Sequence, residues 1–462
     1  MPLHTLELPW RCPTAVARAL ARHCGAEGLV LLDGDGGPLG QRAVLGVDPV
    51  ETVCCRGLPG QPGASDPFAA LRAMGRAGGP WLGWLAYEAG AWVEPSAPWH
   101  APDMATLWAV RHDPLLHFDR TAHRCWLAGR DPGRLAAMAA LLDTLPPGGD
   151  GPRAAHPIAS PGGASPAGEL AAPSSAADPA TLGPAIPLAD WCWHTGPQAY
   201  AARVAQVLER IAAGDLFQAN LTACCESLRP AAPDPLALWE RLRRACPAPF
   251  AGVAIGAGEA VVSASPERFL RVSPDGQVET RPIKGTRPRS ADPERDAAAA
   301  ADLVCDPKDR AENVMIVDLL RNDLGRVCAP GSIQVPQLVG LESYAQVHHL
   351  TSVVCGTLAP GRDLVDLLRA CWPGGSISGA PKVRACSRLR SLEPVPRGPY
   401  CGSLFHWDAA GGFDSSILIR SVMVRGRRLR LHAGGGIVAD SDPEAEAEEM
   451  GWKISPLLEA LA

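Results

Sequence analysis

The sequence predicts a mixed α+β fold on three observations. Short apolar segments bounded by turn residues are typical of strands, and single segments with apolar residues at helical spacing lie between them. Two of the strand-like segments are joined across Asp275-Gly276, a dipeptide that favours a hairpin and therefore antiparallel pairing. With 462 residues, 47% of them apolar, the chain can bury a large core and hold one large or two ordinary domains.

Three regions are predicted along the chain. Residues 145–190 are rich in Pro, Ala, Gly and Ser and have few bulky apolar residues, which is typical of a linker. They separate an N-terminal region, residues 1–144, from a C-terminal region, residues 191–462. In the N-terminal region we expect helices at 15–23 and 67–76, strands at 29–32, 81–87 and 107–110, and a turn at 48–49.

The C-terminal region carries the clearer periodicities. Tyr200, Val204 and Val207 recur at helical spacing and Gly214 is a natural stop, which predicts a helix at 198–213. Similar signals predict helices at 234–245, 309–322, 363–371 and 381–389, and from residue 442 to the end. Strands are expected at 215–224, 347–358, 403–407, 416–424 and 428–432, and residues 252–263 are expected to lead into a hairpin that starts at Glu267.

Composition narrows the classes of function. A net charge of −6 gives no support for a nucleic-acid partner. Since no run approaches about 18 uncharged apolar residues, we expect no membrane span. The N-terminus lacks a basic region followed by an apolar run, and the 15 cysteines include no C-x-x-C pair. We therefore expect a cytoplasmic protein with free thiols.

The predicted hairpin brings an acid and an amine together. Its strands are Glu267–Val272 and Gln277–Lys284, and a two-residue loop at Asp275-Gly276 would place Glu267 directly opposite Lys284. Opposed residues lie roughly 4.5–5.5 Å apart, within reach of one small substrate. The alternative is an exposed cross-strand ion pair, which contributes little.

Lysine is rare in this chain. It occurs four times among the 43 basic residues, at Lys284, Lys308, Lys382 and Lys453. A desolvated lysine can lose its proton and act as a nucleophile, whereas an arginine cannot. The lysines are therefore candidates for chemistry, and the alternative is the chance survival of a few surface lysines.

Acidic residues suggest a metal site. Glu446, Glu449 and Lys453 share one face of the terminal helix, and Glu312 lies early in the helix predicted at 309–322. If Glu312 and Glu449 converge, they form an oxygen site suited to Mg²⁺. The alternative is that these acids interact favourably with helix N-termini.

Two glycine-rich turns could present backbone N–H groups to an anion. One spans Gly374–Lys382 and includes Ser376, Gly379 and Ala380; the other is Gly434–Gly436. Either could equally be only a tight turn. Arg420 could hold a carboxylate or form a structural ion pair. Neither H-E-x-x-H nor G-x-S-x-G is present, so metalloprotease and serine hydrolase chemistry lack their residues.

Residues 195–458 resemble the chorismate-utilising enzymes. The matching motifs are Gly214–Leu221, Ser265–Phe269, Pro282–Thr286, Glu312 with Leu319–Gly325, His349-Leu350, Pro373–Lys382, Gly434–Asp440 and Glu446-x-x-Glu449-x-x-x-Lys453. The resemblance implies large antiparallel sheets packed as a sandwich with flanking helices. The N-terminal region is similar to the family's N-terminal domain through 31–33, 47–49 and 83–87.

Within this family, Lys284 discriminates. Anthranilate synthase large subunits typically have alanine in P-I-A-G-T, whereas the branch that aminates chorismate at C4 has the lysine found here. Isochorismate and salicylate synthases typically have a lysine base at the position of Gln218. The resemblance therefore implies C4 amination; anthranilate formation and a non-catalytic regulatory subunit remain the alternatives.

The resemblance also implies site roles. Glu312 and Glu449, with Glu446 near, would hold Mg²⁺, while Lys284 attacks C2 of chorismate and Glu267 protonates the departing C4 hydroxyl. Ammonia would then enter at C4, supplied by a separate glutamine amidotransferase chain. Substrate contacts are implied for Thr286, His349, Ser376, Gly379, Ala380, Tyr400, Arg420, Gly434, Gly435, Gly436 and Lys453.

Some family members bind tryptophan in the N-terminal domain. The matching positions here are Gly34, Val44, Pro249, Phe250 and Ala251. A serine typical of that pocket is replaced by Gly34, which departs from the family's pattern.

Overall fold

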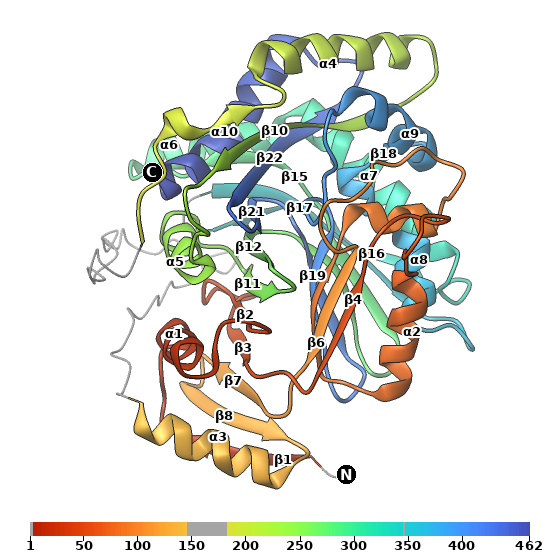
Figure 1. Ribbon diagram of the computed structural model, residues 1–462. Coiled ribbons are helices and arrows are strands. Elements are labelled where there is room, and N and C mark those ends of the chain that lie inside the picture. The colour runs from red at the N-terminus through yellow and green to blue at the C-terminus, as the bar shows by residue number, and fades with distance from the viewer. Residues whose placement is uncertain (1–2, 146–182, 345–346) are drawn as a thin grey trace.

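Two large antiparallel sheets pack face to face in the computed structural model, which describes residues 3–145, 183–344 and 347–462 (Figure 1). The first sheet has 12 strands. Along the sheet their order is β1 (His4–Leu8), β8 (Arg124–Gly129), β7 (Leu115–Asp119), β3 (Arg42–Gly46), β2 (Val30–Asp33), β11 (Phe250–Gly256), β12 (Glu259–Ser265), β21 (Ser421–Arg425), β22 (Arg428–Ile437), β10 (Gln218–Leu228) and β18 (Gly379–Ala380), with β9 (Cys192–Trp193) beside β10.

The second sheet has ten strands. Their order is β15 (Ile283–Pro288), β17 (Val347–Thr357), β14 (Gln277–Arg281), β13 (Arg268–Val272), β20 (Phe413–Ile417), β19 (Ser403–Trp407), β5 (Trp81–Leu85), β6 (Leu107–Arg111) and β4 (Glu51–Cys55), with β16 (Gln334–Ser343) beside β17. The N-terminal region contributes strands to both sheets, because β2 pairs with β11 and β5 pairs with β19. Much of the segment predicted as a linker, residues 146–182, lies outside the described residues.

Helices cover both outer faces of the sandwich. They are α1 (Pro13–Cys24), α2 (Pro67–Ala77), α3 (Pro132–Thr144), α4 (Pro197–Ala212), α5 (Pro235–Ala245), α6 (Pro293–Cys305), α7 (Pro307–Gly325), α8 (Leu364–Cys371), α9 (Lys382–Leu392) and α10 (Pro443–Leu461). Six of them begin with Asp-Pro, as at Asp442-Pro443. The aspartate accepts N–H bonds of the first turn, and proline at the first position needs no donor. The sequence did not predict α3 or α6.

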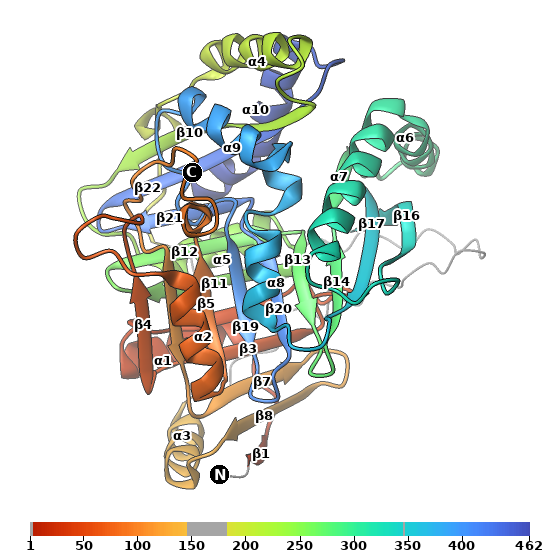
Figure 2. The same ribbon diagram turned by 90° about the vertical axis from the view of Figure 1, so that its right-hand side faces the viewer.

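Three apolar layers hold the sandwich together. Trp84 and Trp108 of the second sheet stack 4.6 Å apart between the sheets, where they meet Val30 and Val44 of the first sheet. A second layer joins the first sheet to α1, α4, α5 and α10, and a third joins the second sheet to α2, α7 and α8. Figure 2 shows α4 and α10 over β10 and β22, with α8 along the second sheet. Burial of this apolar area is the main stabilising contribution.

The strand predicted at 416–424 was wrong. Residues 416–424 do not form one strand: β20 belongs to the second sheet and β21 to the first, and the chain crosses between them at Arg420. Arg420 has a φ of +50°, a left-handed conformation that interrupts both ladders. Residues 252–263 lie in two paired strands, β11 and β12, joined by a turn.

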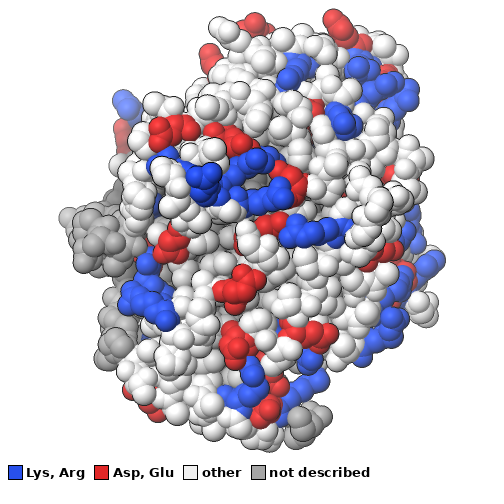
Figure 3. Space-filling view, viewed as in Figure 1, with Lys and Arg blue, Asp and Glu red and all other residues white. Residues whose placement is uncertain are grey.

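Charged side chains on the face in Figure 3 are mixed in sign. Basic side chains gather around a small hollow, in the part of the view where β21 and β22 lie in Figure 1, and acidic side chains border it. On β22, Arg428 and Arg430 both form ion pairs with Asp103 and Glu226. Among the described residues, no helix is both long and apolar enough to cross a bilayer.

Candidate active site

Two glycines of β22 lie at the centre of the candidate site. A Cβ atom on Gly436 would lie 3.2 Å from Lys284 Nζ and 3.3 Å from Glu312 Oε2. A Cβ atom on Gly435 would lie 3.2 Å from Glu446 Oε2. Any side chain at these positions would fill the space between the charged groups. The glycines therefore leave room where the acids and lysines converge.

Each of the three acids predicted as metal ligands has a lysine neighbour. Lys284 Nζ lies 3.8 Å from Glu312 Oε2 on α7, and Lys308 Nζ lies 2.8 Å from Glu446 Oε1. Lys453 Nζ lies 2.7 Å from Glu449 Oε1, and both residues are on α10. Three of the four lysines thus lie at the site, while Lys382 instead pairs with Asp323 at 2.5 Å.

The lysines and burial shift the pKa values of these acids in opposite directions. Burial raises the pKa of Glu312, and the Lys453 ammonium lowers the pKa of Glu449. Burial and the nearby negative charges at Glu446 and Glu449 both disfavour a second charge at Glu312. Among the described residues, however, no group of three or more His, Cys, Asp or Glu side chains is arranged to hold a metal. The Mg²⁺ prediction thus rests on carboxylates supplemented by substrate and water.

Glu267 and Lys284 approach the same short turn. The hairpin register was wrong, because Val272 pairs with Val278 and Lys284 lies on β15, which pairs with β17. A register shift in β13 and a break at Pro282 between β14 and β15 separate the two residues in the ladder. They meet instead at Ser376, whose hydroxyl donates to Glu267 Oε1 at 2.7 Å and whose carbonyl accepts from Lys284 Nζ at 3.5 Å.

Glu267 is placed to hold a proton. It is 5% exposed, and burial raises the pKa of its carboxyl to about 7. The Ser376 hydroxyl, the Lys284 charge and the Ile283 amide oppose this rise in pKa by favouring the carboxylate. A carboxyl with a pKa near neutrality suits a general acid.

His349 and Thr286 line the site from β17 and β15. Thr286 Oγ1 lies 2.8 Å from His349 Nδ1, and the two residues are paired across the ladder. Burial lowers the pKa of His349 to about 3, so its ring is neutral near pH 7. The pair offers hydrogen bonds without adding charge.

Arg420 is a partly buried cation with no carboxylate partner within the described parts of the chain. Burial lowers the pKa of its guanidinium. Its positive charge lowers the pKa of His349, which indicates that the two side chains are close. A desolvated guanidinium without an anion is costly, so the arrangement favours a ligand carboxylate.

Several backbone groups of the two glycine-rich segments already form hydrogen bonds within the protein. The Gly435 amide donates to the Tyr200 hydroxyl at 3.2 Å, so that amide is engaged before any substrate binds. Gly379 and Ala380 form β18, which pairs with β10. Lys453 Nζ also donates to the Gly434 carbonyl at 3.0 Å.

Tyr400 lies farther back from the charged groups. Its ring is 4% exposed and stacks on His432, with ring centroids 4.9 Å apart. Among the described residues, no hydrogen bond or ring contact joins Tyr400 to Lys284 or Glu267. Its role in substrate binding remains a prediction.

Three site residues were missed as site candidates. Lys308 was noted only for its rarity and Tyr200 only for its helical spacing, while Gln218 entered only as a contrast with related enzymes. Gln218 is 1% exposed, lies against the position of a Gly436 Cβ, and neither of its amide atoms has a partner in the described structure. An amide without a partner beside Lys284 would have been a signal, but only the fold places it there.

The predicted tryptophan-site residues do come together. Gly34 follows β2 and Pro249 precedes β11, and these two strands pair. A Cβ atom on Gly34 would lie 2.6 Å from the Pro249 carbonyl oxygen, so a serine would require movement. Val44 and Ala251 are buried nearby, and Arg268 lies over the Phe250 ring at 5.0 Å. Ligand binding here remains a prediction.

The chain is similar in sequence to proteins of one known enzyme family. The chorismate binding enzyme family model matches residues 61–459. An aminodeoxychorismate synthase of Streptomyces pristinaespiralis is 38% identical over 386 residues, which cover 82% of this chain and 50% of that protein. Aminodeoxychorismate synthase component 1 of Klebsiella aerogenes is 44% identical over 271 residues, or 59% of each chain. The chain thus spans about half to three-fifths of these relatives.

Relatives with another name also match. Anthranilate synthase component 1 of Streptomyces coelicolor is 37% identical over 422 residues, which cover 88% of this chain and 79% of that one. The structure of anthranilate synthase component I from Streptococcus pneumoniae has a TM-score of 0.71 at 27% identity, covering 90% of this chain and 92% of that one. The expected sandwich of antiparallel sheets is confirmed.

Proposed function

Because the chain belongs to the chorismate binding enzyme family, we propose that it is an aminodeoxychorismate synthase component that aminates chorismate at C4. The observation that carries the proposal is the placement of Lys284. A lysine and a carboxyl with a pKa of about 7 both meet the Ser376 turn. The two residues provide a nucleophile and a proton donor close enough together to act on one small substrate.

The chain's own residues can perform the two chemical steps. Lys284 gives up its ammonium proton to solvent and its nitrogen attacks C2. The ring double bonds shift, and the C4–O bond breaks as Glu267 gives its proton to the hydroxyl, which leaves as water. Ammonia then forms a bond to C4, the double bonds shift back, and the C2–N bond breaks. The proton released by the new C4 amine balances the proton that the departing Lys284 nitrogen takes up. The enolpyruvyl group is retained throughout, so no pyruvate forms.

Binding is assigned to the charged groups around these two residues. Arg420 is the unneutralised cation near His349 and is placed to hold one substrate carboxylate. Thr286 and the neutral His349 would add hydrogen bonds.

The carboxylates fit Mg²⁺ by their chemistry. Glu312 and Glu449, with Glu446 beside them, supply the hard oxygen donors that Mg²⁺ prefers, and one or two such ligands with waters and an anionic substrate are sufficient. When bound, the ion would neutralise clustered negative charge and hold a substrate carboxylate. Lys284, Lys308 and Lys453 neutralise the same acids in the structure described here.

A partner chain is part of the proposal. Relatives from Klebsiella aerogenes and Salmonella typhimurium are named component 1, which indicates a second component for those proteins. We expect ammonia to come from a glutamine amidotransferase component, and free ammonium to replace it in vitro.

Product analysis tests the function directly. The purified chain is incubated with chorismate, Mg²⁺ and ammonium, and the products are separated by chromatography and identified by mass spectrometry. We expect 4-amino-4-deoxychorismate, whose mass retains the enolpyruvyl group. Anthranilate with an equal amount of pyruvate would contradict the proposal and support anthranilate synthase, the function named for the Streptomyces coelicolor relative. Failure to bind chorismate in calorimetry would instead support a non-catalytic subunit.

Arg420 provides a prediction about binding. Replacing Arg420 by Gln is expected to raise the KM for chorismate about 10- to 100-fold, since charge-assisted hydrogen bonds contribute about 1.5–3 kcal/mol. The measurement is steady-state kinetics at saturating ammonia. Arg428→Gln is the matched control, because Arg428 pairs with Asp103 and Glu226 away from the site. An unchanged KM in Arg420→Gln would show that Arg420 does not contact the substrate.

A further inference from the structure

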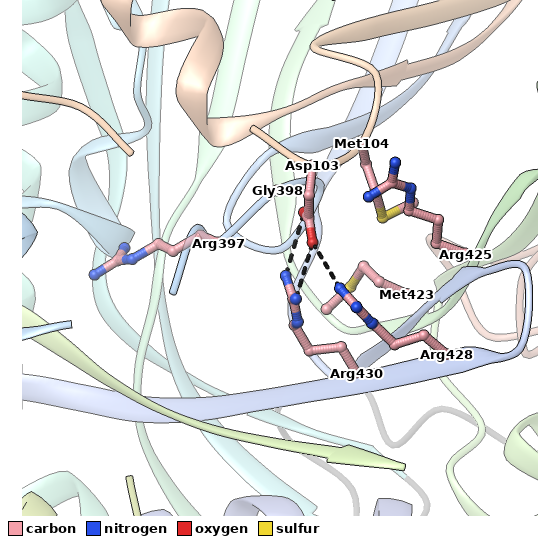
Figure 4. Close-up of a pocket in the computed structure, with 8 residues that line it drawn as sticks. All are labelled: Asp103, Met104, Arg397, Gly398, Met423, Arg425, Arg428 and Arg430. Carbon is pink, nitrogen blue, oxygen red and sulfur yellow. Dashed lines mark hydrogen bonds and ion pairs between the residues drawn. The ribbon is translucent and has the colours of Figure 1, made fainter. Parts of the chain in front are cut away.

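Arg397 is a buried arginine that neither the sequence analysis nor the proposed reaction uses. It follows α9 and is 2% exposed. In Figure 4 the Asp103 carboxylate lies between Arg428 and Arg430, whereas the Arg397 side chain extends away from this cluster into the protein. Its charge is therefore balanced elsewhere.

Glu393 neutralises the guanidinium, and the ring of Tyr87 packs against it. Arg397 Nε and Nη2 donate to the two Glu393 oxygens at 2.8 and 2.6 Å. The guanidinium also lies 4.5 Å from the centre of the Tyr87 ring. This bidentate pair with a ring face fixes the plane of the guanidinium and aims its remaining N–H groups.

The remaining donors join two segments that carry site residues. Arg397 Nη1 donates to the Ile377 carbonyl at 2.8 Å, and Nη2 donates to the Asn220 carbonyl at 2.6 Å. Ile377 directly follows Ser376, and Asn220 lies two residues after Gln218 on β10. The Asn220 amide also donates to the Ser378 carbonyl at 2.8 Å. Arg397 thus clamps the turn 375–378 against β10.

We propose that Arg397 is a positioning residue that orients the Glu267 carboxyl by clamping the Ser376 turn against β10. The connection runs from Arg397 to the Ile377 carbonyl, along the backbone to Ser376, and through the Ser376 hydroxyl to Glu267. The inference rests on the proposed function for the role of Glu267, but the connection itself is a feature of the structure.

Stability alone does not account for this arrangement. A buried ion pair is a weak source of stability, because its desolvation cost offsets much of the attraction. What the pair provides is a fixed donor geometry facing two carbonyl groups. A small displacement of the Ser376 turn would move its hydroxyl away from Glu267, and errors of about 1 Å in a catalytic geometry can cost about 100-fold in rate.

Arg397→Lys tests the connection, because lysine keeps the charge but lacks the planar fork of donors that makes four hydrogen bonds to Glu393 and the two carbonyls. We expect kcat/KM to fall about 10- to 100-fold. The Ser376 hydrogen bond lowers the pKa of Glu267, so losing it should raise that pKa above about 7. Ser376→Ala should raise the pKa similarly, and the double variant should add little further change.

The titration of Glu267 is measured without turnover. Infrared spectra recorded across pH, with Glu267→Gln as the reference, follow its carboxyl band in each variant. Lys284 is the charged group that faces Glu267, so the titration is repeated in a Lys284→Met background. Arg430→Lys is the matched control, since Arg430 is a buried arginine paired with Asp103 and Glu226. It should leave the titration and kcat/KM unchanged.

A double variant guards against loss of folding. Arg397→Met with Glu393→Met removes both buried charges, so neither is stranded. We expect it to fold and still to show the raised Glu267 pKa and the lower kcat/KM. A normal Glu267 titration in either folded variant, or additive effects with Ser376→Ala, would overturn the positioning role. Failure of the proposed function would give a different result: the Arg397 variants would still shift the Glu267 titration, but the parent protein would not aminate chorismate at C4.

Discussion

Replacing Lys284 by alanine is expected to lower the rate of C4 amination on the order of 10³-fold or more. Without the amine there is no nucleophile to form the covalent intermediate, and single removals of a nucleophile are among the largest effects in enzymes. The structure supports this expectation, since Lys284 lies on β15 between Glu312 and the Ser376 turn. Rates are measured as product formed from chorismate and ammonium.

Lys284→Arg separates charge from nucleophilicity. Arginine retains the positive charge beside Glu312 but does not lose its proton, so this variant should be as slow as Lys284→Ala. In the parent protein, quenching during turnover should leave substrate mass on the peptide that contains Lys284. Substantial C4 amination by Lys284→Arg, or no modified peptide in the parent, would limit Lys284 to an electrostatic role.

Replacing Glu267 by glutamine is expected to lower kcat about 10²- to 10⁴-fold, the usual range for general acid catalysis. Glutamine keeps the shape of the side chain and a carbonyl oxygen for the Ser376 hydroxyl, but it cannot give up a proton. The loss should therefore appear in kcat more than in the KM for chorismate.

The pH dependence of the reaction identifies the acid. Burial raises the pKa of Glu267 to about 7, so its protonated form predominates below that pH and is lost as pH rises. At a constant concentration of free ammonia, kcat/KM should fall as pH rises above about 7, and Glu267→Gln should lack this limb. Glu279→Gln is the control, because Glu279 pairs with Arg268 at the surface of the same sheet. An unchanged limb in Glu267→Gln would assign the proton to another group.

Local signals in the sequence predicted many elements well. Asp442-Pro443 predicted the start of α10, and the spacing of Tyr200, Val204 and Val207 predicted α4. Both signals act within a turn or two of helix, which is why they can be read without a fold. The strand expected at 416–424 was wrong because Arg420 adopts a left-handed conformation, with a φ of +50°, and the strand ends there. The residues on both sides are apolar, so the hydrophobic pattern of the sequence does not show this break.

Part of the candidate site was also predicted from the sequence, and part of it was not. Lys284, Glu312, Glu446 and Glu449 were expected from residue type, spacing and family resemblance, and the structure brings them together around Gly435 and Gly436. The contact between Lys284 and Glu267 was attributed to the hairpin ladder, and that register was wrong. The two residues meet through Ser376 instead.

From the sequence alone come the helix starts, the antiparallel character of the sheets and the identities of the acids and lysines that carry the chemistry. Each depends on residue type or on neighbours a few positions away. Only the tertiary structure decided that Ser376, 109 residues from Glu267 and 92 from Lys284, joins them. It also decided that Arg397, 177 residues from Asn220, clamps that turn. Such contacts arise from packing two sheets and their helices into one core, and no local preference encodes which distant groups that packing brings into hydrogen-bond distance.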